Sequence, residues 1–209
     1  MSVATSVGAT YYIELECQAE PNISAGFLMG RLMHSLHIGL VNTTPPGERC
    51  PIGVTFPEYR LPEKSSASFN AASPPIGSRL RLFAQDEATL DGFPWRRVLR
   101  GLDDYVYRTT VRETGSNSQY AAFARRQHNR SIGRLVRRAM KRKGLSESEA
   151  MALYADHEPG ECRLPYVDMR SESSGERFRL FVERLEVPPS HKWGFSSYGL
   201  SRSVPLPAF

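Results

Sequence analysis

Apolar and polar residues alternate along much of the first half of the chain, and this pattern predicts strands. In residues 10–18 the alternation places Tyr11, Ile13, Leu15 and Cys17 on one side, as in a strand with one buried face. Similar patterns predict further strands in residues 51–56, 79–84 and 105–113.

A repeat of leucines predicts the first helix. After a break at residues 21–24, Leu28, Leu32, Leu36 and Leu40 recur one helical turn apart. We therefore expect a helix that begins near residue 24 and ends near residue 40. A second helix is expected around residues 94–102, and a Ser-, Ala- and Pro-rich loop in residues 57–77.

These elements follow the order of the ferredoxin-like, or split βαβ, arrangement. We therefore predict an α+β protein in which residues 1–116 form a ferredoxin-like domain. RNA-recognition domains with this arrangement stack bases on aromatic residues of the sheet. The strand RLRLFA (79–84) matches that signature poorly, so we do not expect RNA to bind on the face of this sheet.

The second half of the chain predicts an amphipathic, arginine-rich helix within residues 130–143. Its expected apolar face consists of Ile132, Leu135, Val136, Ala139 and Met140. Gly144 is suited to end this helix, and Ser146 with Glu149 has the spacing of a capping box that opens a second short helix. Strands are expected in residues 165–171 and 177–187. Residues 117–209 would then form a smaller α+β domain.

Positive charge is concentrated in one segment. The net charge is +5, yet residues 125–143 alone hold nine Lys or Arg residues, and no Asp or Glu occurs from residue 114 to residue 146. Without those nine, 18 basic residues face 22 acidic ones, a net charge of −4. A local surplus of this kind favours binding to a polyanion such as nucleic acid. An acidic protein or a membrane surface is the alternative, although the helix has no Trp or Phe opposite its basic face.

Other sequence features limit the location of the protein. No stretch is apolar and long enough for a transmembrane helix, and residues 1–10 do not look like a signal peptide. The three cysteines, Cys17, Cys50 and Cys162, form no CxxC pair. We therefore expect a reducing compartment, the cytoplasm, with no membrane contact.

The residues that could carry chemistry are ambiguous by themselves. His34 and His37 lie one helical turn apart, a spacing that can bind a metal, but no third ligand completes a site. Ser171 fits the end of a strand and Tyr198 fits packing in a loop. We find none of the common nucleotide-binding, metalloprotease or serine-hydrolase motifs.

Several segments together resemble a known family. They are YYIELECQ (11–18), SLHIGLV (35–41), IGVTFPE (52–58), PWRRVLRGL (94–102), ARRQHNRSIGRLVRRAMKRKGLSESEA (124–150), LPYVDMRSESSGERFRLFV (164–182) and FSSYGLS (195–201). The chain is similar over nearly its whole length to the CRISPR-associated endoribonuclease of type I-F systems. That family cuts precursor CRISPR RNA within each repeat.

The resemblance implies an RNA hairpin as the partner of the basic helix. The residues that match those holding phosphates of the repeat stem are Arg134, Arg137, Arg138, Lys141 and Arg142. Arg125 and Gln127 match the two residues that read bases at the foot of the stem, a role suited to side chains that bind guanine and adenine edges in pairs of hydrogen bonds. Phe178 matches the aromatic residue that stacks under the terminal base pair. Residues 117–209 would therefore be the hairpin-binding domain.

The resemblance also implies the catalytic residues. His37 matches the proton-transferring histidine, Ser171 the serine that holds the attacking 2′-hydroxyl, and Tyr198 a tyrosine that orients the site. The implied reaction needs no metal or other cofactor, and it leaves a 2′,3′-cyclic phosphate. His34 competes with His37, because a shift of one turn would exchange them.

Two functions follow as alternatives. The first is a repeat-specific endoribonuclease that stays on the mature guide RNA as a subunit of the type I-F surveillance complex. The second is a structural subunit that binds the hairpin without cleaving it. Pure binding would need none of His37, Ser171 and Tyr198, so their presence together favours the enzyme.

Overall fold

The computed structural model describes residues 10–61, 76–115, 119–127, 132–154, 162–172 and 174–209. The chain divides into two compact units. One consists of residues 1–126 and 164–209, and the other of residues 127–163. The domain boundary predicted from the sequence, after residue 116, stays a prediction.

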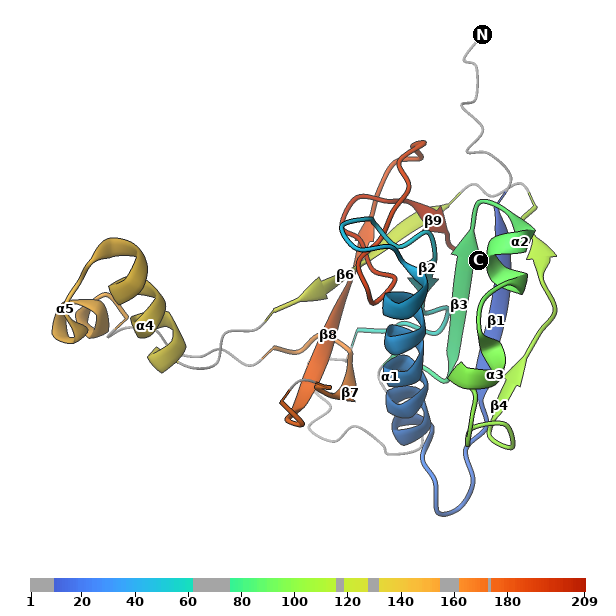
Figure 1. Cartoon of the computed structure of the whole chain (residues 1–209), viewed down its shortest axis with the longest axis horizontal. Coiled ribbons are helices and arrows are strands. Elements are labelled where there is room, and N and C mark those ends of the chain that lie inside the picture. Colours follow the sequence, from blue (N-terminus) through green and yellow to red (C-terminus); the bar gives the residue numbers. More distant parts are fainter. Residues whose placement is uncertain (1–9, 62–75, 116–118, 128–131, 155–161, 173) are drawn as a thin grey trace, which may run out of the picture. The chain divides into compact units, whose positions relative to one another are not determined.

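An antiparallel sheet forms from the first half of the chain (Figure 1). It contains β1 (Tyr11–Cys17), β2 (Gly53–Thr55), β3 (Arg79–Ala84), β4 (Val106–Arg108) and β5 (Arg112–Glu113). The strands follow the order β2-β3-β1-β4, and β5 also pairs with β1. The α+β class is confirmed. The order is compatible with the ferredoxin-like assignment, which stays a prediction.

The strand predicted in residues 105–113 is interrupted. Both of its parts, β4 and β5, pair with β1, but the register changes by one residue, from Leu15 opposite Arg108 to Tyr12 opposite Arg112. At the change, the hydroxyl of Thr109 accepts a hydrogen bond from the backbone N–H of Glu14, 3.0 Å away. One extra residue is therefore accommodated as a bulge.

Three helices accompany this sheet: α1 (Ala25–Thr43), α2 (Glu87–Asp91) and α3 (Trp95–Val98). The leucine repeat predicted α1 correctly, and all four leucines are buried. Ser24 caps the helix by accepting a hydrogen bond from the N–H of Phe27. The predicted helix at 94–102 is shorter than expected, and α2 was not predicted.

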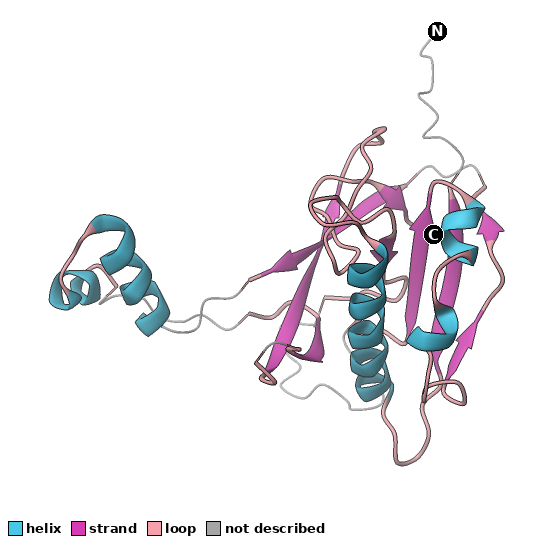
Figure 2. Ribbon diagram, viewed as in Figure 1, coloured by secondary structure: helices cyan, strands magenta, loops and turns pink. Residues whose placement is uncertain are grey.

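A second antiparallel sheet belongs to the same compact unit (Figure 2). It consists of β6 (Tyr120–Arg126), β7 (Tyr166–Arg170), β8 (Arg177–Glu186) and β9 (Leu206–Pro207), in the order β7-β8-β6-β9. The sequence predicted β7 and β8 but missed β6, which runs through three alanines of low strand propensity. Its residues 121–124 are nonetheless buried, because β6 is an inner strand.

Helix α1 packs against β7 of the second sheet and also contacts α3 and β1 (Figure 1). The approach is closest at Gly30, where an added Cβ would lie 2.5 Å from the backbone oxygen of Asp168. Only glycine permits this separation. One continuous core contains buried residues of α1 and of both sheets, so the helix is held firmly where it meets β7.

The second compact unit contains α4 (Ile132–Lys143) and α5 (Glu147–Ala152). Val136, Ala139 and Ala150 form its small buried core. The predicted capping box is present, since Ser146 and Glu149 each accept a hydrogen bond from the backbone N–H of the other. Within the described residues, no helix is both long enough and apolar enough to span a bilayer.

Candidate active site and RNA interface

His37 lies half-buried on helix α1 and is held through one ring nitrogen. Its Nδ1 lies 2.8 Å from the backbone carbonyl oxygen of Ser197. A carbonyl oxygen only accepts hydrogen bonds, so Nδ1 carries the hydrogen. In the neutral ring, the basic lone pair is therefore on Nε2, for which no hydrogen-bond partner is found in the described part of the chain. The ring is arranged to exchange a proton through Nε2.

Tyr198 fixes the plane of the same imidazole. The two rings are stacked, with centroids 4.1 Å apart and planes inclined by 8°. Tyr198 follows Ser197 directly, so one loop supplies both the hydrogen bond and the stacking partner. Ser196 closes this loop, since its N–H donates to Leu200 O at 2.9 Å and its carbonyl accepts from Gly199 N–H at 2.8 Å.

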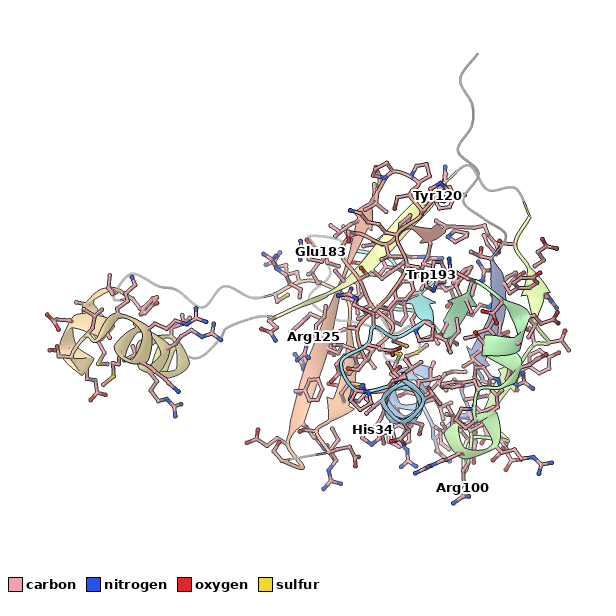
Figure 3. All side chains as sticks on the ribbon, turned by 45° about the horizontal axis from the view of Figure 1, so that its top comes forward. His34, Arg100, Tyr120, Arg125, Glu183 and Trp193 are labelled. Atoms are coloured by element: carbon pink, nitrogen blue, oxygen red, sulfur yellow. The ribbon has the colours of Figure 1, made fainter. Side chains whose placement is uncertain are left out.

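The tail loop, residues 193–200, is attached to the segment before β2. The indole N–H of Trp193, labelled in Figure 3, donates to the carbonyl of Pro51 at 2.7 Å. Cys50 and Phe195 exchange backbone hydrogen bonds of 3.1 and 2.9 Å. Desolvation by burial raises the pKa of the Cys50 thiol, so this side chain packs as a small neutral group.

Two glycines allow the tail loop to approach β2 closely. An added Cβ on Gly53 would lie 2.4 Å from the ring of Phe195. Gly199 has φ +70 and an added Cβ there would lie 2.4 Å from the side chain of Val54, while Val54 N–H donates to Gly199 O at 2.8 Å. The position of Tyr198 over His37 therefore depends on these close backbone contacts.

Ser171 lies at the end of β7, in the turn that leads to β8. Its N–H donates to Glu176 O, and its carbonyl accepts from Gly175 N–H, both at 2.8 Å. Its hydroxyl accepts from Ser174 N–H at 3.3 Å. The next residue, Glu172, contacts His34 of α1, with 2.8 Å between Oε1 and Nε2.

Arg125 joins the predicted stacking residue to the tail loop. It lies at the end of β6 (Figure 3). Its guanidinium carbon is 5.6 Å from the ring centroid of Phe178, on β8, and 5.3 Å from that of Tyr198. The structure thus brings His37, Tyr198, Arg125 and Phe178 into one row of neighbouring side chains.

The predicted phosphate-binding residues lie on the second compact unit. Arg137, Arg138, Lys141 and Arg142 are exposed on α4. Arg134 falls in the helix, but its side chain lies outside the described residues. Gln127, just after β6, is exposed.

Comparison with known proteins decides the family. The sequence matches the family described as CRISPR-associated protein (Cas_Csy4) over residues 12–209. The chain belongs to the Cas_Csy4 family. It is 34% identical over 203 residues to the CRISPR-associated endonuclease Cas6/Csy4 of Pseudomonas aeruginosa (strain UCBPP-PA14), covering 95% of this chain and 99% of that protein.

A second relative is similar over the same extent. The CRISPR-associated endonuclease Cas6/Csy4 of Escherichia coli (strain UTI89 / UPEC) is 29% identical over 202 residues, which is 95% of this chain and 99% of the relative. The resemblance noted from the sequence is thereby confirmed at the level of the family. The roles of individual residues in this Cas_Csy4 chain stay predictions.

Three features of the site were not found from the sequence. They are the carbonyl of Ser197 on His37, the contact between His34 and Glu172, and the place of Arg125 beside two rings. Every residue has a backbone carbonyl, so the type of amino acid does not reveal which carbonyl accepts a hydrogen bond from His37. Contacts across such long stretches of chain have no local spacing to reveal them.

No group of three or more His, Cys, Asp or Glu side chains in the described part of this Cas_Csy4 chain is placed to hold a metal ion. The three cysteines are free thiols, with Cys17 and Cys50 buried. Desolvation by burial raises the pKa of the Cys17 thiol to about 12, so this side chain is a packing residue at neutral pH.

Proposed function

We propose that this protein is an endoribonuclease that binds the hairpin of a CRISPR repeat in precursor RNA and cleaves at its base. The observation that carries the proposal is the state of His37. Its Nδ1–H is donated to Ser197 O, and its Nε2 is left as the basic nitrogen, the kind of group that most often transfers protons in enzymes. Both relatives are named CRISPR-associated endonucleases, which supports the same function.

The reaction we propose is an attack by the RNA on itself. His37 Nε2 takes the proton of a ribose 2′-hydroxyl, and the 2′-oxygen forms a bond to the adjacent phosphorus. The bond from phosphorus to the 5′-oxygen breaks, and that oxygen takes a proton from water. The hydroxide left by the water takes the proton from the imidazolium of His37, which returns the base to its neutral form. The products are a 2′,3′-cyclic phosphate and a 5′-hydroxyl. The nucleophile belongs to the RNA, so this route needs no metal-bound hydroxide.

Ser171 and Tyr198 have supporting roles in the proposed reaction. Ser171 would hold the 2′-hydroxyl, and its place in a turn closed by two backbone hydrogen bonds suits a group that must hold its position. Tyr198 would keep the imidazole plane fixed by stacking on it. Nothing in this scheme requires the tyrosine hydroxyl to exchange a proton.

Binding of the hairpin would be divided between phosphate contacts and base contacts. The exposed cations of α4, with Arg134 of the same helix, would hold phosphates along the stem. A-form RNA exposes its base edges poorly in the deep groove, so this helix would bind without reading sequence. Arg125 and Gln127 would read bases at the stem foot, and Phe178, already beside the guanidinium of Arg125, would stack under the terminal base pair.

We further propose that the protein keeps its product. It would remain on the hairpin of the mature guide RNA as a subunit of the type I-F surveillance complex, in the cytoplasm. The proposed contacts between α4 and the phosphates of the stem do not involve the bond that is cut. They would therefore persist after cleavage, which supports retention of the product.

The experiment that tests this function uses the purified protein, its own repeat RNA and EDTA. We expect cleavage at one position, with a cyclic phosphate on the upstream product. A 2′-deoxy nucleotide immediately 5′ of the cut should abolish cleavage, because it removes the nucleophile. Tight binding without cleavage would instead show a structural hairpin-binding subunit. Cleavage that requires magnesium would contradict the mechanism.

A further inference from the structure

Helix α1 carries a second histidine, His34, one turn before His37. Its Nε2 lies 2.8 Å from Oε1 of Glu172. Glu172 directly follows Ser171. This contact therefore joins the helix that carries the proposed base to the turn that carries the proposed 2′-hydroxyl ligand.

The contact continues the packing of α1 on β7. The backbones meet at Gly30 and Asp168, where no side chain fits on the helix. His34 and Glu172 each lie four residues further along the chain. The helix and the strand with its turn are thus connected at two successive points, and the second point is next to Ser171.

The two histidines are engaged through opposite ring nitrogens. A carboxylate only accepts hydrogen bonds, so the Nε2 of His34 is its donor. The Nδ1 of His34 is buried and has no hydrogen-bond partner among the described residues. His37 instead donates through Nδ1 and keeps Nε2 for substrate. His34 therefore offers no accessible basic nitrogen, which fits holding a neighbour rather than moving a proton.

We expect the contact between His34 and Glu172 to affect the geometry of the site more than the stability of the fold. The His34 side chain is 24% exposed and that of Glu172 is 66% exposed. Ion pairs with exposed partners contribute little to the stability of a fold. Ser171, by contrast, must stay at a defined place relative to His37, because misplacement of a reacting group by about 1 Å can slow catalysis about a hundredfold.

We propose that His34 is a positioning residue. Its Nε2–H holds the carboxylate of Glu172, and this fixes the β7–β8 turn, and with it Ser171, against helix α1, which carries His37. The inference rests on the proposed cleavage reaction, since it assigns the two residues a part in that reaction.

The test compares single-turnover cleavage and hairpin affinity in variants of the full chain. His34→Ala and Glu172→Ala should each slow cleavage about tenfold, the effect expected from losing a hydrogen bond to a charged group. Hairpin Kd should not change. The double variant should be no slower than either single variant, because both remove the same contact. Glu176→Ala, in the same turn, is the control and should cleave like wild type, because Glu176 takes part in the turn through its backbone N–H and carbonyl, which the substitution keeps.

Two amide substitutions separate holding from proton transfer. Gln at position 34 can place an N–H where the Nε2–H of histidine lies, whereas the shorter Asn can place one only near Nδ1. His34→Gln should therefore cleave at close to the wild-type rate, and His34→Asn should be as slow as His34→Ala. If His34→Gln is as slow as His34→Ala, the imidazole takes part in proton transfer and the positioning role is wrong.

A readout without cleavage distinguishes failure of this inference from failure of the proposed function. Amide hydrogen exchange of Ser171 and Gly175 reports whether the turn is held, because both N–H groups bond within it. Exchange should be faster in His34→Ala and unchanged in His34→Gln. If wild type does not cleave but exchange responds in this way, the contact holds the turn and the proposed function fails. If wild type cleaves and His34→Ala matches it in rate and exchange, the positioning inference fails.

Discussion

His37 and Tyr198 stack face to face, with ring centroids 4.1 Å apart and planes inclined by only 8°. The carbonyl oxygen of Ser197, the residue before Tyr198, accepts a hydrogen bond from the Nδ1–H of His37. The tail loop therefore sets both the tautomer and the plane of the imidazole. A small displacement of this loop would change both at once.

The stacking predicts different effects for two substitutions of Tyr198. Tyr198→Phe keeps the ring and should retain most of the single-turnover cleavage rate. Tyr198→Ala should slow cleavage roughly two- to tenfold, since aromatic pairs contribute roughly 0.5–1.5 kcal/mol beyond their buried area. If Tyr198→Phe is as slow as Tyr198→Ala, the hydroxyl has a chemical role that the stacking does not explain.

The exposed cations of α4 predict a binding affinity that falls steeply with salt. Arg138→Ala should weaken binding to all hairpins alike and reduce the slope of log Kobs against log salt by about 0.7–0.9, the loss of one phosphate contact. Arg100, exposed on the first compact unit, provides the control, and Arg100→Ala should leave the slope unchanged. An unaltered slope in Arg138→Ala would remove this residue from the phosphate-binding set.

Because Arg125 and Gln127 are proposed to read bases, their substitution should reduce selectivity among hairpins rather than affinity for all of them. Arg125→Ala and Gln127→Ala should each weaken binding to hairpins with the preferred base pair at the stem foot by roughly 1–3 kcal/mol. Binding to hairpins with that pair altered should hardly change. Filter binding to a small set of altered stems makes this comparison. Equal weakening on every stem would mean that the two side chains contact phosphates.

The capping box of α5 predicts a titration that NMR can follow. The side-chain hydrogen bond from Ser146, with a second from its backbone N–H, lowers the pKa of Glu149 below its ordinary value. A lowered pKa means that the ionised carboxylate stabilises the helix above the unfolded-state pKa, and that this contribution is lost as the pH falls through the folded-state pKa. Ser146→Ala should move the Glu149 midpoint back up. A midpoint that stays low in the variant would refute the assigned cause.

The elements that the sequence predicted best are those with a strong local pattern. The leucine repeat of α1, the alternation of β3 and the Ser146–Glu149 capping box all follow from residues a few positions apart. The inner strand β6 was missed because its alanines favour no strand locally. Burial between β8 and β9 decides its conformation.

The candidate site was predictable only in part, for a related reason. Its residue types came from the resemblance to the family, while His34 and His37 could not be separated by periodicity, since both lie on the same helix. Two long-range contacts distinguish them. His37 donates a hydrogen bond to the carbonyl oxygen of Ser197, whereas His34 contacts the carboxylate of Glu172. Such contacts arise only when the tail loop and the β7–β8 turn are brought to α1 by the fold.

The paired measurement of cleavage and hairpin affinity in His37→Ala tests the central claim most directly. The account predicts a fall in single-turnover rate of roughly 10²–10⁴-fold, the usual contribution of a general acid–base group, with Kd for the hairpin close to wild type. His191→Ala, which removes an exposed histidine, should leave the rate unchanged. If His37→Ala cleaves at nearly the wild-type rate, His37 is not the proton-transfer group.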